Sequence, residues 1–418
     1  MKETKNVPQL RFSGFDDEWE EKNFSEITYI SATKNKSNLP LESYSITNEN
    51  GFIPQNEQFE NGGTMKDADK RMYWIVPPKS FGYNPARINV GSIGYYDGKK
   101  DVIVSSLYEI FKMTENCDDA FFWQWFKSDN LQKQVLKLQE GGVRLYFYYD
   151  KLCMGEIKIP SKGEQQKIGS LLSNLDSLIQ TKTKKLESLK AVKKSLLQKC
   201  FPKAGQKVPE IRFESNKEWA SINFEDCFSF LSNNSFSRDE LNYEKGYIKS
   251  LHYGDVLIKF GEILNVSTAS LPYITQINSP KQYSKSILKN GDIVIADAAE
   301  DNTVGKCTEI QNCNELLTAG VHTIAVRPKI EFAPTFLGFY INSESFHNQL
   351  LPLIQGTKVS SISKSTIVDT VIYYPISITE QQKIGQFFSK YDSLISVQQK
   401  EIDKLKDIKK SLLQKMFV

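Results

Sequence analysis

The sequence predicts an α+β protein in which two mixed α/β globular domains are joined by two long helices forming an antiparallel coiled coil, as a pseudo-twofold tandem duplication. One segment occurs twice, at 164–201 and at 380–417, with an offset of 380 − 164 = 216 residues and more than half of its positions identical. Each copy follows a body that begins with a similar hexapeptide, VPQLRF at 7–12 and VPEIRF at 208–213. The bodies themselves share little sequence, so a duplicated helix follows two unlike domains.

The length of the chain and the repeat predict the same number of domains. A chain of 418 residues suggests about two globular domains with some additional elements. Pro202 and Gly205 lie in a short stretch without apolar periodicity, which predicts a helix end and a linker. The predicted organisation is domain 1 at 1–163, a repeated helix at 164–201, a linker at 202–207, domain 2 at 208–379 and a second repeated helix at 380–418.

The first body alternates between strand signals and one helix signal. Strands are predicted at 101–111 and 144–150, where β-branched and aromatic residues are bounded by turn formers. A helix is predicted at 118–140, because apolar residues recur there at helical spacing and Asp118 or Asp119 can cap its start.

The second body repeats this plan with other residues. Strands are predicted at 254–258, 291–295 and 321–328, the first two following a Gly-Asp turn. A helix is predicted at 334–354. Each body is therefore expected to be a mixed α+β domain.

The repeated segments carry the spacing of a coiled-coil seam. Apolar residues recur at steps of four and three, with one polar and one basic position interrupting each seam. A helix of this length spans about 55 Å, and antiparallel pairing would place one body at each end. The alternative is that each helix packs only on its own domain. The predicted seam consists of Leu175, Ile179, Leu186, Leu189 and Leu196 in the first helix and Tyr391, Ile395, Ile402, Leu405 and Leu412 in the second.

Motifs for catalysis and for cofactor binding are missing from the sequence. It contains no GxxxxGK[ST] loop, no GxGxxG after a strand, no HExxH and no GxSxG, and its 3 histidines are widely spaced. We therefore predict no catalytic residues, no metal site and no cofactor in this chain. Its 6 cysteines form no CxxC pair, and the first residues lack the apolar run of a signal peptide. These features predict a cytoplasmic protein without a membrane segment.

Several loops combine cations, amides, hydroxyls and aromatic rings, the mixture that contacts bases and phosphates. Arginine forks match guanine, lysines supply point charge to phosphates, and asparagines match adenine. Any single one of these residues could equally be a surface residue or a turn former, as we infer for Asn84 in the turn Asn84–Arg87. The candidate DNA-binding residues are Lys34, Lys36, Tyr83, Asn84, Arg87, Asn89, Ser92, Arg144 and Tyr146 in the first body, and Asn233, Asn234, Arg238, His252, Tyr253, Asn302, Thr357, Lys358 and Ser360 in the second.

The repeated motifs EQQKIG, DSLI and KKSLLQK, each following a body that ends in a prolyl strand at Pro160 or Pro375, resemble the specificity subunit of type I restriction-modification enzymes. The resemblance covers nearly the whole chain. It implies that each body is a target recognition domain for one half of a bipartite double-stranded DNA site. It also implies that the helix pair sets the gap between the halves and docks two modification (methyltransferase) subunits. S-adenosylmethionine, ATP, Mg²⁺ and the DNA-cleaving restriction subunits would belong to the partners, so this chain would be non-catalytic.

Two other function classes make different predictions. A self-contained methylating or restriction enzyme would methylate DNA without partners, but it needs a cofactor loop or an acidic nuclease triad. A coiled-coil adapter that binds only protein would show no salt-dependent binding to duplex DNA, whereas neutralisation of phosphates makes affinity fall as salt rises.

Overall fold

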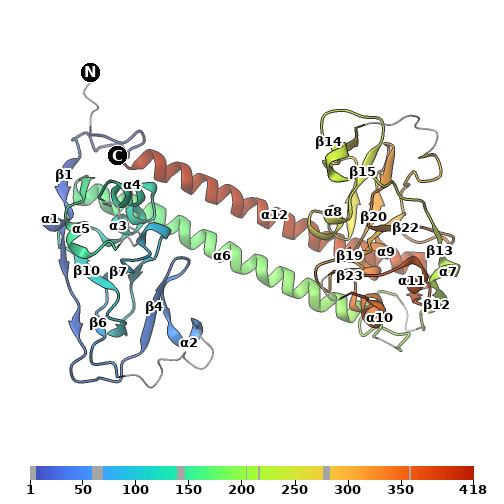
Figure 1. Cartoon of the computed structure of the whole chain (residues 1–418), viewed down its shortest axis with the longest axis horizontal. Coiled ribbons are helices and arrows are strands. Elements are labelled where there is room, and N and C mark those ends of the chain that lie inside the picture. The colour runs from blue at the N-terminus through green and yellow to red at the C-terminus, as the bar shows by residue number, and fades with distance from the viewer. Residues whose placement is uncertain are drawn as a thin grey trace. The chain divides into compact units, whose positions relative to one another are not determined.

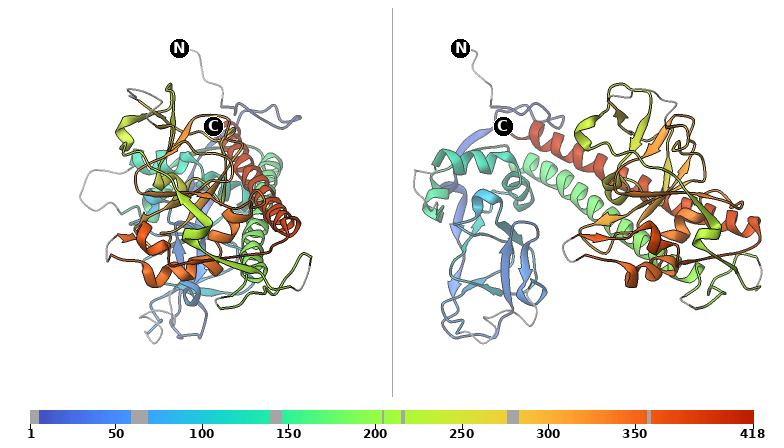
Figure 2. Two further views of the ribbon diagram at one scale, coloured as in Figure 1. Left: turned by 90° about the vertical axis from the view of Figure 1, so that its right-hand side faces the viewer. Right: turned by 45° about the vertical axis from the view of Figure 1, so that its right-hand side comes forward.

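The computed structural model describes residues 6–58, 69–138, 146–203, 205–214, 217–275, 283–356 and 359–418. The chain forms two compact units: unit 1 consists of Met1–Thr183 with Lys400–Val418, and unit 2 consists of Lys184–Gln399. Two helices of 39 residues each, α6 (Lys162–Cys200) and α12 (Ile378–Met416), contribute residues to both units and run without a break (Figures 1 and 2).

Unit 1 contains three sheets with short helices packed on them. Their strand orders are β1-β11, β2-β10-β7-β8 and β3-β6-β9-β4-β5. In chain order the elements are β1 (Glu20–Asn23), α1 (Phe24–Ile27), β2 (Thr28–Ile30), β3 (Thr33–Lys34), β4 (Ser43–Thr47), β5 (Gly51–Pro54), α2 (Gln55–Gln58), β6 (Trp74–Val76), β7 (Ser80–Tyr83), η2 (Ile88–Val90), β8 (Ile93–Tyr96), β9 (Val102–Val104), β10 (Glu109–Met113), α3 (Asp119–Phe126), α4 (Asp129–Leu138), α5 (Tyr149–Cys153) and β11 (Glu156–Ile159).

Unit 2 contains four sheets, with strand orders β12-β24, β13-β22-β18-β20-β16, β14-β17-β15-β21 and β19-β23. In chain order its elements are β12 (Ala220–Asn223), α7 (Phe224–Cys227), β13 (Phe228–Phe230), η3 (Arg238–Glu240), β14 (Leu241–Asn242), β15 (Lys249–Leu251), α8 (Tyr253–Ile258), β16 (Ile263–Asn265), β17 (Tyr273–Ile274), β18 (Ile293–Ala296), β19 (Ala298–Ala299), β20 (Cys307–Gln311), β21 (Leu317–Ala319), β22 (Thr323–Pro328), α9 (Phe336–Ile341), α10 (Glu344–Leu350), η5 (Leu351–Leu353), β23 (Ser360–Ser361), α11 (Lys364–Ile367) and β24 (Val371–Tyr374).

The two units share a frame although their sequences differ. In each unit the first strand pairs antiparallel with the strand before a long helix, Glu20 opposite Ile159 and Ala220 opposite Tyr374. In each unit a helical turn and a short strand follow, and that strand pairs antiparallel with a later strand of a larger sheet. The helix pairs α3–α4 and α9–α10 occupy the same place in chain order, before the last strand of each unit.

Within each unit, the segments of α6 and α12 run antiparallel. In unit 1, Asp176 contacts Lys409 while Lys182, farther along α6, contacts Glu401, which comes earlier on α12. In unit 2, Lys193 contacts Asp392, and the Phe201 ring after the end of α6 stacks at 6.0 Å on Phe388, nearer the start of α12. All ten predicted seam residues are buried or half-buried.

In each unit, the larger hydrophobic core cluster includes the end of one long helix. The core of unit 1 packs the sheet containing Phe111 against Phe126 of α3, with ring centroids 5.8 Å apart, and also includes Phe417 after α12. The core of unit 2 includes Cys200 and Phe201 at the end of α6. Burial of aromatic side chains therefore attaches the long helices to the bodies.

The two predicted body helices are each divided in two by a serine. Within 118–140, α3 ends at Phe126 and α4 begins at Asp129, while Ser128 Oγ donates to Trp125 O at 2.6 Å. Within 334–354, α9 and α10 are separated at Ser343, whose Oγ donates to Tyr340 O at 2.6 Å. A serine hydroxyl that bonds a backbone carbonyl competes with helix continuation. The predicted cap is confirmed, because Asp118 Oδ1 accepts from Phe121 N at 2.9 Å.

Two predicted strands are wrong. Residues 254–258 lie in α8, because His252 caps a helix start by accepting from Gly254 N at 3.1 Å. Of the segment 144–150, the described part is a loop followed by the start of α5 at Tyr149. Apolar runs of this length do not distinguish a strand from a short buried helix.

Among the described residues, no helix is both long and apolar enough to cross a membrane.

Candidate nucleic-acid interface

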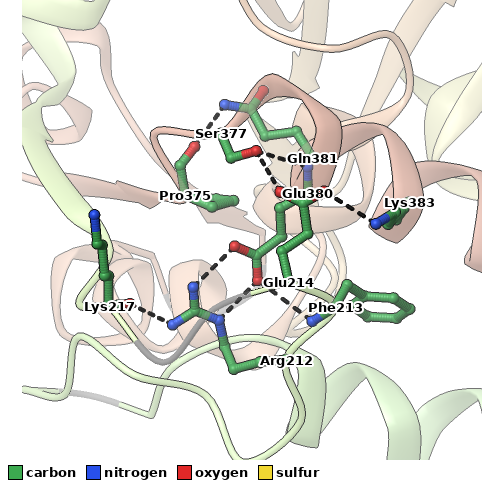
Figure 3. A network of polar contacts seen from close by, with 9 residues as sticks. All are labelled: Arg212, Phe213, Glu214, Lys217, Pro375, Ser377, Glu380, Gln381 and Lys383. Atoms are coloured by element: carbon green, nitrogen blue, oxygen red, sulfur yellow. Dashed lines mark hydrogen bonds and ion pairs between the residues drawn. The ribbon is translucent and has the colours of Figure 1, made fainter.

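Each unit is closed by a buried ion pair between its VPxxRF segment and the first turn of a long helix. In unit 2, Arg212 Nε and Nη2 donate to the two carboxylate oxygens of Glu380 at 2.7 and 2.8 Å (Figure 3). In unit 1, Arg11 makes the same fork to Glu164 at 2.8 and 2.9 Å. The side chains of Glu164 and Glu380 are 0% and 1% exposed. A two-pronged arginine–carboxylate pair restricts geometry as well as adding energy, so the first residue of EQQKIG anchors the helix.

The second residue of EQQKIG binds the body at two further points. Gln165 Oε1 accepts from Asp118 N, and Gln165 Nε2 donates to Pro160 O, both at 2.9 Å. Gln381 makes the equivalent two bonds in unit 2, each at 2.8 Å. The side-chain amide of this glutamine thus connects two parts of the body to the long helix. One is the end of the last strand, and the other is the segment that precedes the helix pair of the body.

The VPxxRF segment also bonds the long helix that ends in the same unit. Leu10 N donates to Lys415 O in unit 1, and Ile211 N donates to Lys199 O in unit 2, both at 2.9 Å. The repeated residues are therefore explained by anchoring. The chemistry that could distinguish ligands lies in the loops that differ between the bodies.

An exposed turn of unit 1 gathers three of the predicted site residues. Asn84 caps the predicted turn, accepting from Ala86 N through Oδ1 at 3.0 Å and from Arg87 N through its carbonyl at 2.9 Å. The side chains of Arg87 and Asn89 are exposed beside it. The turn thus presents a guanidinium and an amide to solvent.

Two stacked tyrosines stand next to this turn. Phe147 N donates to Pro85 O at 3.0 Å, which holds residues 146–148 against the turn. The rings of Tyr146 and Tyr148 are stacked, with centroids 5.6 Å apart and planes at 8°. They are 49% and 50% exposed. We call Asn84, Arg87, Asn89, Tyr146 and Tyr148 the unit 1 cluster; Tyr148 was not among the predicted residues.

Two of the predicted DNA-binding residues of unit 1 have side chains that lie in the core. Tyr83 is 0% exposed and Ser92 is 1% exposed, and Ser92 Oγ donates to Ile46 O at 3.1 Å. Tyr83 lies in β7, which is buried along its whole length, and Ser92 directly precedes β8. They can support the turn, but they cannot contact a ligand in this structure.

The two predicted lysines of unit 1 lie on or beside β3 and have different environments. Lys34 Nζ lies 3.3 Å from the centroid of the Trp74 ring and donates to Met72 O at 2.9 Å. Burial lowers the pKa of Lys34. Lys36 is exposed. No contact joins either side chain to the unit 1 cluster among the described residues.

In unit 2, charged and aromatic side chains from η3, from α8 and from the segments after β18 and before β22 lie close together. Arg238 Nη2 donates to Asp255 Oδ1 at 3.1 Å. The Tyr253 ring lies 5.3 Å from that of His322, and His322 Nδ1 lies 3.5 Å from Asp297 Oδ1. We call Arg238, Tyr253, Asp297 and His322 the unit 2 cluster. Burial raises the pKa of Asp297, and the neighbouring His322 partly opposes that shift.

His322 and Asp297 are not among the predicted residues. They become neighbours because β18 and β22 pair antiparallel, which sets Ala296 opposite Thr323 across 27 residues of chain (323 − 296). His322 has a φ of 55°, a left-handed conformation that is uncommon for a residue with a side chain and is often found at functional sites. Spacing alone gives no signal for either residue.

Three predicted residues of unit 2 hold the surrounding loops through hydrogen bonds. His252 is 8% exposed and its ring caps α8, while burial and the nearby Arg238 lower its pKa. Asn234 is 5% exposed and donates to Ser250 Oγ at 2.9 Å. Asn233 donates to Thr323 O. The side chains of His252 and Asn234 are thus buried and hydrogen-bonded within the unit.

The remaining predicted residues of unit 2 lie on neighbouring loops. Ser360 pairs with Ala299 in the small sheet β19-β23, close to Asp297 in sequence, and Asn302 is exposed with its carbonyl 3.0 Å from His347 Nε2. Arg144, Thr357 and Lys358 lie outside the described residues. In the part of the chain that the structure describes, no group of three or more His, Cys, Asp or Glu residues could hold a metal ion.

Comparison with known proteins identifies this architecture. The family model described as "Type I restriction modification DNA specificity domain" matches twice, at residues 16–191 and 216–407. The MjaVIII specificity subunit of a type I restriction enzyme from Methanocaldococcus jannaschii is 28% identical over 338 residues, covering 78% of this chain and 75% of the relative. The putative MjaX specificity subunit of the same organism is 26% identical over 155 residues, 36% of each chain.

Two solved structures share the fold. The S subunit of a type I restriction-modification system from M. genitalium has a TM-score of 0.54 and 15% identity, covering 99% of both chains. A chain from work on the assembly and conformational transition of a type I R-M system has a TM-score of 0.56 and 14% identity, covering 96% of this chain and 98% of its own. These likenesses confirm the predicted mixed fold with a tandem duplication.

Proposed function

The chain belongs to the type I restriction-modification DNA specificity domain family, and on that premise we propose that each of its two units reads one half of a bipartite, asymmetric DNA site. It is a specificity subunit of a type I restriction-modification system, a DNA-recognition component rather than a catalytic one. The two bodies differ in sequence, whereas the contacts that anchor them to the long helices are the same. This contrast fits the proposal, because two different half-sites require different loop chemistry.

The unit 1 cluster supports the proposal for the first half-site. Arg87 and Asn89 supply the side chains that match guanine and adenine edges. Tyr146 and Tyr148 add two half-exposed aromatic faces next to them. The turn is held by backbone bonds, which pre-orients these groups and lowers the entropy cost of binding.

The unit 2 cluster supports a different reading chemistry. Its half-exposed Arg238 offers a guanidinium, while His322 and Asp297 offer an imidazole and a carboxylate. A carboxylate accepts from the amino group of cytosine, which an arginine cannot do. The clusters of the two units therefore differ in charge pattern, as recognition of unlike half-sites requires.

We further propose that α6 and α12 set the spacing between half-sites and dock two modification subunits. Each helix has 39 residues, about 58 Å at 1.5 Å per residue. Leu178 and Ile408 are exposed in unit 1, and their repeat equivalents Leu394 and Val192 are exposed in unit 2 (394 − 178 = 408 − 192 = 216). Matched exposed apolar side chains fit two copies of one partner. S-adenosylmethionine, ATP and Mg²⁺ would be bound by the modification and restriction subunits.

The observation that carries the proposal is the contrast between the repeated anchors and the unlike clusters. It is tested by mapping methylated adenines in a strain that carries the chain with its modification partner. We expect Arg87→Ala with Tyr148→Ala to relax or abolish the first half-site only, and Arg238→Ala with His322→Ala to affect the second only. Changes in both half-sites from either pair, or methylation by the purified chain alone, would contradict separate reading by a non-catalytic subunit.

A further inference from the structure

A hollow of about 700 Å³ in unit 1 is lined by five lysines. It lies at the start of α4, beside the facing segments of α6 and α12. Lys127 and Lys133 reach it from the α3–α4 region, and Lys406, Lys409 and Lys410 reach it from α12. The proposed reading of DNA bases uses none of these residues.

The lining acids do not balance these cations. The lining holds two acidic side chains, Asp129 and Asp176, and also Val418, the last residue, whose α-carboxylate carries a further negative charge, so the cations exceed the anions by two (5 − 3 = 2). Asp176 is fully engaged, because its carboxylate lies 2.5 Å from Lys409 Nζ, 3.5 Å from Lys127 Nζ and 2.9 Å from Gln124 Nε2. Burial tends to raise the pKa of Asp176, but hydrogen bonds from Lys409 and Gln124 hold that pKa below its ordinary value.

Lys127 lies close to Asp176, to Lys409 and to an aromatic ring. Burial lowers its pKa, and the neighbouring Lys409 lowers it further against the opposing pull of Asp176. Lys127 Nζ also lies 4.3 Å from the centroid of the Trp123 ring. An additional anion in the hollow would relieve this crowding of positive charge.

The corresponding place in unit 2 is neutral. The repeat offset of 216 maps Lys406, Lys409 and Lys410 onto Lys190, Lys193 and Lys194. Alignment of the helix-breaking serines, Ser128 and Ser343, sets Asn342 in place of Lys127, Asn348 in place of Lys133 and Glu344 in place of Asp129. These positions hold three lysines and two acids, Glu344 and Asp392, and Lys193 also contacts an additional acid, Glu262.

Contacts in unit 2 show how that neutrality is achieved. Lys193 Nζ lies 2.8 Å from Glu262 Oε1 and 2.5 Å from Asp392 Oδ1, so one lysine is shared by two carboxylates. Burial and the nearby Glu262 raise the pKa of Asp392, opposite in direction to Asp176. The excess of lysines around the hollow of unit 1 therefore does not follow from the repeat.

We propose that the lysine hollow of unit 1 binds a phosphate-bearing anion. Its cations are all compact ammonium groups without an arginine fork, which suits a ligand with several charged oxygens rather than one planar carboxylate. Its volume is in the range of small-ligand sites. The phosphates can belong to a DNA backbone or to a free polyphosphate, and the proposal does not depend on which bases the chain reads.

Binding of tripolyphosphate to the full chain, measured by calorimetry at low ionic strength, tests the proposal. In the triple variant Lys133→Gln, Lys406→Gln, Lys410→Gln, which spares both lysines that hold Asp176, we expect affinity to fall about tenfold or more. The matched control, Lys190→Gln, Lys194→Gln, Lys199→Gln, removes three charges from unit 2 and should change affinity less than about twofold. Unchanged thermal unfolding without ligand shows that the variants fold.

Three results would overturn the proposal: no tripolyphosphate binding, an equal loss in both variants, or citrate binding as tightly as tripolyphosphate. A second measurement separates the two sources of phosphate. If DNA occupies the hollow, the salt dependence of binding to a nonspecific duplex, in complex with the modification partner, becomes shallower by about one phosphate contact or more in the unit 1 variant only. A loss of tripolyphosphate binding with an unchanged salt slope assigns the hollow to a free phosphate ligand.

Discussion

At the scale of single residues, two arginines and two glutamates connect the repeated sequence to both bodies. Arg212 is 9% exposed and Glu380 is 1% exposed, and each unit has one such pair. Removing one member of a buried pair leaves the other charged and unpaired, which costs more than the pair itself contributes. The occurrence of the same arginine and the same glutamate in both copies of the repeat therefore has a structural cause.

We expect Arg212→Met to destabilise unit 2 by about 3–5 kcal/mol, because Glu380 would remain buried without its partner. Denaturant-dependent hydrogen exchange of amides in β18 and β22 measures this. Glu210→Gln, which breaks the exposed pair of Glu210 with Lys203, serves as the control and should leave exchange unchanged. Equal effects of the two substitutions would contradict the anchoring role.

The environment of His252 predicts that the stability of unit 2 depends on pH. Burial and Arg238 lower its folded-state pKa, with Asp255 opposing and His322 adding to the shift. In the unfolded chain a histidine has a pKa of about 6.5, so the unfolded state binds more protons at this residue than the folded state does. The contribution of His252 to stability is therefore complete above about pH 6.5 and is lost as pH falls. We expect His252→Asn, which keeps a capping side chain, to flatten the loss of stability between about pH 7 and 5. An unchanged pH profile of unfolding would argue against it.

At the scale of elements, close packing explains a glycine in the repeated helices. A Cβ added at Gly169 would lie 2.6 Å from Phe121 N, so α3 can approach α6 only where a side chain is missing. Gly385 has the same place in the second copy of EQQKIG, next to Pro334 and Thr335. The final G of the motif thus allows the body helix to contact the long helix.

Gly169→Ala should therefore destabilise unit 1 by about 1–3 kcal/mol through overpacking against backbone atoms. Gly163→Ala is a control on the same helix, since the nearest atom to its added Cβ is Phe15 Cε1 at 3.8 Å. That substitution should be neutral or stabilise the helix by up to about 1 kcal/mol. Thermal unfolding followed by exchange in β7 and β10 distinguishes them, and a neutral Gly169→Ala would contradict the packing argument.

At the scale of the whole molecule, each long helix begins in one unit and ends in the other. Each unit buries the start of one helix and the end of the other through the same anchors. If the helix pair sets the spacing between half-sites, its length is the variable that controls the gap, independently of the loops.

We expect an insertion of four residues between Thr183 and Lys184, about 6 Å or one helical turn, to lengthen the nonspecific gap while both half-sites persist. Methylome sequencing measures this directly. Four residues inserted after Gln206, in the linker, should leave the gap unchanged. A constant gap in the first variant would contradict a ruler function of the helices.

Much of the frame could be predicted from the sequence. The duplication, the long helices, the Asp118 cap and the Asn84 turn all follow from local patterns, because periodicity, capping and turn chemistry act over a few residues. The division of the body helices at Ser128 and Ser343 was missed, since a serine inside an apolar pattern is a weak breaker. The strand predicted at 254–258 failed because a histidine cap outweighed the β-branched residues that followed.

A duplicated frame with two unlike bodies follows from the sequence alone, since repeats and helical periods are properties of neighbouring residues. Which polar residues form sites is set by the tertiary structure. It buried Tyr83, Ser92 and Asn234, joined His322 to Asp297 through strand pairing, and gathered five lysines from separate helices around one hollow. Burial and juxtaposition depend on contacts between residues far apart in the chain, and a linear pattern carries no record of those contacts.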